Sequence, residues 1–310
     1  MDKFCAAFMP YLTVTGVALG ILLGDRISFL SFLVNPFFAF MTFSNTLGIT
    51  IDDFKNVIRR PRPIFVFLAS TYVILPLAFH LIAGLLYSFS SPITLGFVLL
   101  YSIPTAVVSV IWSSINGGNR ALSLTLLIIG TFLAPISTPL TIHLFSSSNV
   151  EFDTSGIVRS LFLIVLVPSF LAILIGKLTK NRFPEVVVPY TRPFAKSILL
   201  FIVMLNVSQI SGDFLAHASL EYLKVGVNAM CFTFLSFFTS YIVSRKVFHI
   251  GKSDAVSVTF ASSMRNISAA LILAISYFPM EVSIPVIFGI VIQQMTSAVA
   301  ARILFGKSSK

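Results

Sequence analysis

The sequence predicts an all-α integral membrane protein with ten transmembrane helices. Of its 310 residues, 56% are hydrophobic and only 10% are charged, which is too few charges to cover the surface of a soluble domain of this length. Its apolar runs are long enough to cross a bilayer, which takes about 20 residues of helix. Its basic residues also fall mostly on one side once the spans are counted. The lipid bilayer is therefore the expected surrounding of this chain.

Clusters of charge and the positions of Pro and Gly divide the chain into its elements. The first apolar stretch is long and is followed at once by another, so we interpret it as a membrane helix rather than a cleaved signal peptide. The connections are short, and no soluble domain is expected between the spans. We expect spans at residues 6–24, 27–50, 63–88, 92–116, 120–145, 157–178, 194–212, 219–243, 254–277 and 281–305.

The basic residues orient these spans. With ten spans both termini lie on one side, and 17 of the 21 Lys and Arg residues fall on that side. Only Arg26, Arg159 and Lys224 fall on the opposite side, and Arg265 lies inside the ninth span. The excess predicts cytoplasmic termini, and we expect the cell membrane as the location. The basic residues are scattered over short loops and form no basic stripe, so no nucleic-acid partner is expected.

A weak internal repeat relates the two halves. Asp53-Phe54 near the end of the second span matches Asp213-Phe214 near the end of the seventh, an offset of 160 residues. Five spans followed by five more have opposite orientation because five is odd. This arithmetic predicts two inverted five-helix repeats, residues 1–150 and 151–310, an arrangement typical of secondary transporters.

Two spans carry polar interruptions at equivalent positions. Pro104 in the fourth span, within YSIPTAVVSV, removes a backbone donor and should kink or break the helix. An ordinary proline kink is the alternative. The offset carries Pro104 to Met264, inside the SSMRN stretch of the ninth span. Paired interruptions of this kind predict a shared site at mid-depth in the membrane.

The segment GGNRALSLTLLIIGTFLAPISTP, residues 117–139, resembles the bile acid:sodium symporter family. The Met264-Arg265-Asn266 stretch is similar to that family's Met-Gln-Asn. The resemblance implies a panel domain and a core domain, with two broken helices (spans 4 and 9) crossing in the core. It also implies alternating-access transport of organic anions, commonly driven by two sodium ions.

The resemblance also implies where sodium ligands should lie, and this sequence departs from the family at those positions. They are occupied by Ala261, Arg265, Val110 and, by a weaker alignment, Thr71. Ala and Val offer no side-chain oxygen, and arginine brings a fixed positive charge. We therefore expect no cofactor and doubt sodium coupling. The candidate substrate-binding or ion-replacing residues are Arg265, Asn266, Ser263, Ser109, Thr105 and Thr131, beside the helix break at Pro104.

Arg265 lies about 17 Å from either end of its span, too far for its side chain to reach the headgroups. Three hypotheses follow. The guanidinium could replace a sodium ion and bond carbonyls of the crossing helix, it could pair with the substrate anion, or it could face a hydrated crevice without a specific role. His80, His143, Gln209, Gln293 and Gln294 are expected mainly to bond between helices.

Other functional classes fit less well. The sequence has no His-Glu-x-x-His or Gly-x-Ser-x-Gly motif and no carboxylate pair inside a span, so an intramembrane enzyme is not expected. A channel would need a continuous polar path, and an arsenite-type carrier would be expected to carry a cysteine on the fourth span. The prediction is a secondary transporter of a small organic anion. The alternatives are a conventional sodium- or proton-coupled symporter in which Arg265 binds the substrate carboxylate, and a membrane sensor that does not transport. Substrate identity, coupling ion and oligomeric state stay open.

Overall fold

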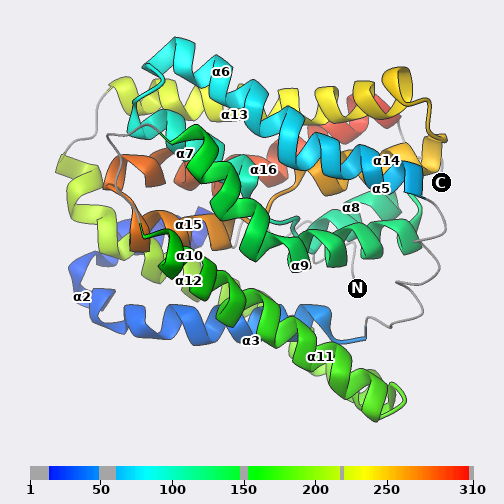
Figure 1. Cartoon of the computed structure of the whole chain (residues 1–310). Coiled ribbons are helices and arrows are strands. Elements are labelled where there is room, and N and C mark those ends of the chain that lie inside the picture. Colours follow the sequence, from blue (N-terminus) through cyan, green and yellow to red (C-terminus); the bar gives the residue numbers. More distant parts are fainter. Residues whose placement is uncertain (1–13, 49–60, 147–152, 217–219, 307–310) are drawn as a thin grey trace.

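A computed structural model describes residues 14–48, 61–146, 153–216 and 220–306, and this part of the chain is helical without strands (Figure 1). The Asp53-Phe54 pair lies outside the described residues. The prediction of an all-α membrane protein is confirmed. Six helical segments are long and apolar enough to cross a membrane, and a seventh is added if Arg182–Thr191 and Pro193–Gln209, bent by 41°, are one span.

The helices form two groups. In one, the helix Val14–Leu23 and α3 pack against the long α12, and α3 also contacts α11. At Gly20, an added Cβ would lie 2.6 Å from the carbonyl oxygen of Met204, so the first helix approaches α12 too closely for a side chain. The members of this group are Val14–Leu23, α2 (Asp25–Ser28), the 3₁₀ turn η1 (Phe29–Leu33), α3 (Val34–Thr46), α10 (Thr154–Leu161), η3 (Phe162–Leu166), α11 (Val167–Leu178) and α12 (Arg182–Ala216).

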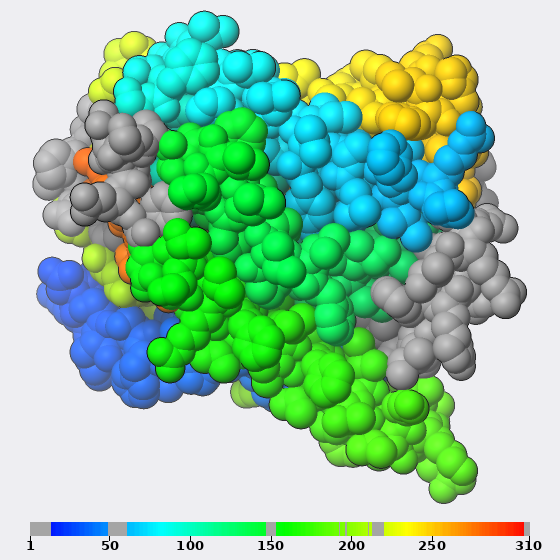
Figure 2. Space-filling view, in the orientation of Figure 1, coloured from blue at the N-terminus to red at the C-terminus, as the bar shows by residue number. Residues whose placement is uncertain are grey.

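The second group surrounds two interrupted helices. In Figure 1, α5, α6 and α13 lie along one side of the molecule, α3 and α11 along the other, and α9 between them. Figure 2 shows α11 projecting beyond the rest of the surface. The members of this second group are α5 (Pro61–Ala69), η2 (Ser70–Ile74), α6 (Leu75–Tyr87), α7 (Pro92–Ser102), α8 (Val108–Ile115), α9 (Arg120–Phe145), α13 (Leu220–Ile242), η4 (Val243–Val247), α14 (Lys252–Ser263), α15 (Ile267–Tyr277) and α16 (Met280–Phe305).

The predicted fourth and ninth spans are each made of two shorter helices, α7 with α8 and α14 with α15. Arg265 lies in the non-helical segment between α14 and α15, inside the polar SSMRN stretch. The backbone of Arg265 is extended and pairs with the break of the other interrupted helix. A residue inside a continuous helix could not form this pairing.

Two π-helical turns precede prolines. In η2 the Leu75 N–H donates to Ser70, five residues back, and Pro76 follows. In η3 the Val167 N–H donates to Phe162 in the same way, and Pro168 follows. A proline has no N–H and its ring clashes with the carbonyl four residues earlier. The wider five-residue spacing relieves that clash and leaves a carbonyl without its helical donor.

Candidate functional site

The two interrupted helices meet at their breaks, residues 103–107 and 264–266. Thr105 and Arg265 face each other there in an isolated antiparallel bridge. The Thr105 hydroxyl also donates to the carbonyl of Ala261 at 2.8 Å. Backbone groups freed by the breaks are thus satisfied inside the protein, as lipid surroundings require.

Two backbone hydrogen bonds flank the bridge. The Ala106 N–H donates to the Met264 carbonyl with an N···O distance of 2.9 Å. The Asn266 N–H donates to the Pro104 carbonyl, also at 2.9 Å. In this pattern the bridge residues themselves do not bond each other, so the N–H and C=O of Arg265 point away from the first break.

The Arg265 side chain is buried, with 1% of its surface exposed. Its Nη1 donates to the carbonyl of Ile103 at 3.3 Å, and its Nη2 donates to the carbonyl of Thr71 at 3.2 Å. Its Nε has no partner among the described protein atoms. The guanidinium therefore bridges the first break and the η2 turn of a third helix.

The Thr71 carbonyl is available because of the π-helical turn. In a regular α-helix it would accept from Leu75, but the Leu75 N–H is bonded to Ser70. The next residue, Pro76, has no N–H to offer. A π-turn and a proline together expose this carbonyl to the arginine. The Ile103 carbonyl is likewise free because α7 ends at Ser102.

Among the Asp, Glu, Lys and Arg side chains that the structure describes, Arg265 is the one that is buried. No buried carboxylate in this part of the chain therefore balances its charge. The same part of the chain has no group of three or more His, Cys, Asp or Glu side chains that could hold a metal ion. Among the described residues, the hydrogen-bond acceptors of the guanidinium are the two backbone carbonyls.

The positions where the family resemblance implies sodium ligands are buried. Val110 and Ala261 are apolar and closely packed, with exposures of 7% and 1%. The Thr71 hydroxyl donates to the Ser262 hydroxyl at 3.2 Å. Ser109 is buried, and its hydroxyl has no partner among the described protein atoms.

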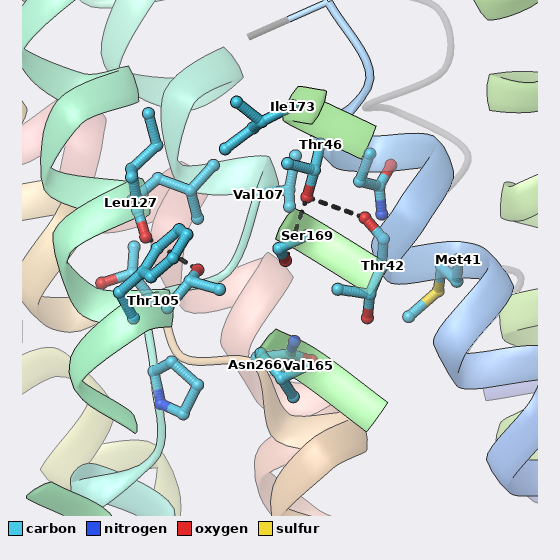
Figure 3. A pocket seen from close by; sticks show the side chains of 15 residues that line it. Met41, Thr42, Thr46, Thr105, Val107, Leu127, Val165, Ser169, Ile173 and Asn266 are labelled. Atoms are coloured by element: carbon cyan, nitrogen blue, oxygen red, sulfur yellow. Dashed lines mark hydrogen bonds between the residues drawn. The ribbon is translucent and has the colours of Figure 1, made fainter. Parts of the chain in front are cut away.

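A pocket lies between the two helix groups, on the side of the crossing formed by Pro104, Thr105 and Asn266 (Figure 3). The pocket is small and partly open, with a cavity volume of about 30 Å³. None of its lining residues carries a charge, and Arg265 is not among them. The lining residues are Met41, Thr42, Asn45 and Thr46 of α3, Pro104, Thr105 and Val107 of the first break, Leu127, Ile128, Thr131 and Phe132 of α9, Val165 of η3, Ser169 and Ile173 of α11, and Asn266 of the second break.

The pocket unites only some of the residues that the sequence singled out. Thr105, Thr131 and Asn266 line it with Pro104. Arg265, Ser263 and Ser109 do not line it, and the Ser263 hydroxyl donates instead to Ser240 at 3.4 Å. The roles of these residues stay predictions.

The sequence analysis missed the wall of the pocket that α3 and α11 provide. There the Thr46 hydroxyl donates to the Thr42 carbonyl at 2.8 Å and lies 3.3 Å from the Ser169 hydroxyl (Figure 3). A signal was present, because the stretch TFSNT, residues 42–46, places four polar residues within an apolar span.

Comparison with known proteins identifies the family of the chain. A model of the Sodium Bile acid symporter family matches residues 35–217, more than half of the chain. The chain belongs to this family. The match ends before the second break, where Arg265 lies. Membership makes the protein an integral membrane transporter and not an enzyme.

Several relatives are similar over much of their length. The protein YbaS of Bacillus subtilis is 30% identical over 291 residues, which is 94% of each chain. YocS of Bacillus subtilis, named an uncharacterized sodium-dependent transporter, is 28% identical, over 63% of this chain and 59% of its own. A probable sodium/metabolite cotransporter of rice chloroplasts, BASS2, is 24% identical, over 89% of this chain and 64% of its own. The chain thus spans less than two thirds of the last two relatives.

Proposed function

We propose that this protein is a secondary transporter of small organic anions that works by alternating access, with Arg265 in place of a coupling sodium ion. The observation that carries the proposal is the buried guanidinium held by the carbonyls of Ile103 and Thr71. Sodium in proteins is likewise held by oxygen atoms, and here a tethered cation bonds two carbonyl oxygens. The apolar Val110 and Ala261 support the proposal, since neither could supply a ligand oxygen from its side chain.

The substrate is an anion that binds in the pocket beside the crossing. Two helices, α8 and α15, begin at the breaks, so their positive ends lie near the pocket. The guanidinium adds a full positive charge near the same crossing. The hydroxyl and amide groups of Thr42, Asn45 and Asn266 could orient a carboxylate.

The transport movement is a rocking of one helix group against the other, because the pocket lies between them. The group of α5–α9 and α13–α16 corresponds to the expected core, and the group of Val14–Leu23, α2, α3 and α10–α12 corresponds to the panel. In the proposed topology ten spans leave both termini in the cytoplasm and the protein resides in the cell membrane. Substrate entry and exit then require only that this one contact surface open on alternate sides.

The bridge at the crossing supports the proposed inverted repeat, residues 1–150 and 151–310. Thr105 and Arg265 are 160 residues apart, the offset found between the Asp-Phe pairs. The same shift carries Ala106 to Asn266 and Pro104 to Met264. A two-fold axis through the bridge would therefore place each of the two flanking hydrogen bonds on the other.

A second candidate is a conventional sodium-coupled symporter in which Arg265 binds the substrate carboxylate. The names of YocS and the rice relative, which refer to sodium, favour it. Against it stands the burial of the guanidinium away from the pocket lining.

Uptake into proteoliposomes distinguishes the two candidates. A panel of bile acids, pantoate and 2-oxo acids is tested with and without a sodium gradient. We expect wild-type uptake without sodium. The double variant Arg265→Gln, Ala261→Glu places an amide and a carboxylate at two positions where the family resemblance implies sodium ligands, so its uptake should require sodium. The smaller side chain at position 265 and the larger one at position 261 partly offset each other in volume.

Strict sodium dependence of the wild-type protein would disprove the replacement of sodium by Arg265. Binding without uptake would indicate a sensor. Binding can be followed by the fluorescence of Trp112, the single tryptophan, which stacks on Phe260 of α14 with ring centroids 6.3 Å apart.

A further inference from the structure

The side chain of Gln293 on α16 bonds both backbone groups of Arg265. The Arg265 N–H donates to Oε1 of Gln293 at 2.8 Å, and Nε2 of Gln293 donates to the Arg265 carbonyl at 3.0 Å. Both distances are ordinary for strong hydrogen bonds. Gln293 is itself buried, with 7% of its surface exposed.

This pairing completes the environment of the second break. On one edge, Met264 and Asn266 bond the first break through Ala106 and Pro104. On the other edge, the N–H and C=O of Arg265 point toward α16, where the amide of Gln293 supplies one acceptor and one donor in a single plane. The side chain thus takes the place of a third strand, and the extended segment is held on both edges.

We propose that Gln293 is a positioning residue that fixes the backbone of Arg265 so that its guanidinium stays on the carbonyls of Thr71 and Ile103. The guanidinium reaches carbonyls of two other elements, so a small shift of its Cα would break at least one of these bonds. Gln293 ties that Cα to α16, which packs closely against α13 and α7. The inference deepens the proposed role of Arg265.

The chemistry at position 293 is specific. Asparagine has the same amide but is one methylene shorter, so it could not reach both groups from the same helix position. Glutamate keeps the acceptor for the Arg265 N–H but, when ionised, has no donor for the carbonyl. Methionine has a similar length and offers neither bond of comparable strength.

The neighbouring Gln294 provides a matched control. It is also buried, with 8% exposed, and its Oε1 accepts from Trp112 Nε1 at 3.2 Å. Gln294 therefore shares residue type and helix with Gln293 and is similarly buried, but it bonds Trp112 and not Arg265.

The test measures how fast phenylglyoxal, an arginine reagent, modifies Arg265 in the purified full-length protein. Peptide-resolved mass spectrometry compares Arg265 with Arg302, which is exposed on the same helix as Gln293. In the wild type we expect Arg265 to react at least tenfold more slowly than Arg302. Gln293→Met should raise the ratio at least tenfold, Gln293→Glu should give an intermediate ratio, and Gln294→Met should leave it unchanged.

Size-exclusion behaviour establishes that each variant is folded. Trp112 emission is a second criterion for the Gln293 variants only, because Gln294→Met removes the hydrogen-bond partner of Trp112. A folded Gln293→Met protein with wild-type protection of Arg265 would overturn the proposal, as would equal effects of Gln293→Met and Gln294→Met. If Gln293→Met does not fold, the ratio for Gln293→Glu decides, and wild-type protection there overturns the proposal. Failure of the proposed function shows separately, as sodium-dependent uptake by the wild-type protein.

Discussion

A guanidinium carries five N–H donors, and at Arg265 two carbonyl oxygens accept from it. Placing an arginine at the centre of a bilayer costs about 2.5–3.5 kcal/mol on insertion scales. Hydrogen bonds to charged groups contribute about 1.5–3 kcal/mol each. Two such bonds can therefore offset the cost of burial without a carboxylate, which explains how the charge is tolerated at this position.

Substitutions at Arg265 separate its charge from its shape. Arg265→Met removes the charge but keeps an unbranched side chain, and we expect it to abolish sodium-free uptake. Arg265→Lys keeps the charge as a compact ammonium that cannot match the guanidinium fork. Loss of one charged hydrogen bond, about 1.5 kcal/mol, corresponds to roughly a tenfold lower initial rate of uptake. Wild-type uptake by Arg265→Met would contradict the proposed role.

At the scale of elements, the π-helical turn η2 and Pro76 create one of the two acceptors. A proline inside a helix is about 3 kcal/mol less favourable than alanine, so this arrangement lowers the local stability of the third span. The same arrangement leaves the Thr71 carbonyl free to accept from Arg265. Local helix stability and the binding of the guanidinium are therefore opposed at this position.

Pro76→Ala tests this opposition. The new N–H could bond within the helix and draw η2 back to a regular α-helix, which withdraws the Thr71 carbonyl. We expect an equal or higher thermal midpoint together with faster phenylglyoxal modification of Arg265. Pro168→Ala is the matched control, because Pro168 follows the π-turn η3 in the same way but lies in the other helix group. Increased modification in both variants would indicate general loosening instead.

At the scale of the whole molecule, a tethered cation changes the charge that crosses the membrane. A mobile sodium ion moves with the substrate and compensates its charge, whereas Arg265 returns with the protein in each cycle. One complete cycle with a monovalent anion then moves one net negative charge. A membrane potential that is negative inside would oppose uptake of the anion and favour its export.

This charge movement can be measured in sodium-free proteoliposomes in which potassium and valinomycin set the potential. One charge in 100 mV corresponds to about 2.3 kcal/mol, or roughly a fiftyfold ratio of substrate concentrations. We expect a monoanion to accumulate when the inside is positive and to leave when it is negative. Accumulation that ignores the potential but follows a sodium or pH gradient would contradict this expectation.

The sequence predicted the features that depend on local composition. Apolar runs indicated membrane helices, Pro104 marked the first break, and the polar SSMRN stretch marked the second. Through the family resemblance, the apolar side chains at Ala261 and Val110 put sodium coupling in doubt, and the sodium-free uptake assay tests that prediction. The polar TFSNT stretch of α3 is a comparable polar interruption of an apolar span, and it lines the pocket.

The partners of Arg265 could not be predicted in the same way. Its guanidinium bonds Thr71, which is 194 residues away in the sequence, and its backbone bonds Gln293, which is 28 residues away. Pro76 read alone predicts a helix distortion, but not which side chain would use the carbonyl it frees.

The sequence by itself determined that the chain lies in a membrane, that two of its spans are interrupted by polar residues, and that one of them contains a buried arginine. Hydrophobicity and proline act locally, so their effects can be predicted from a short stretch of chain. Only the tertiary structure decided that the arginine bonds two backbone carbonyls, that Gln293 bonds its backbone, and that a pocket lies beside the crossing of the two breaks. Those contacts depend on how helices distant in the sequence pack together, because a hydrogen bond forms only within about 3 Å.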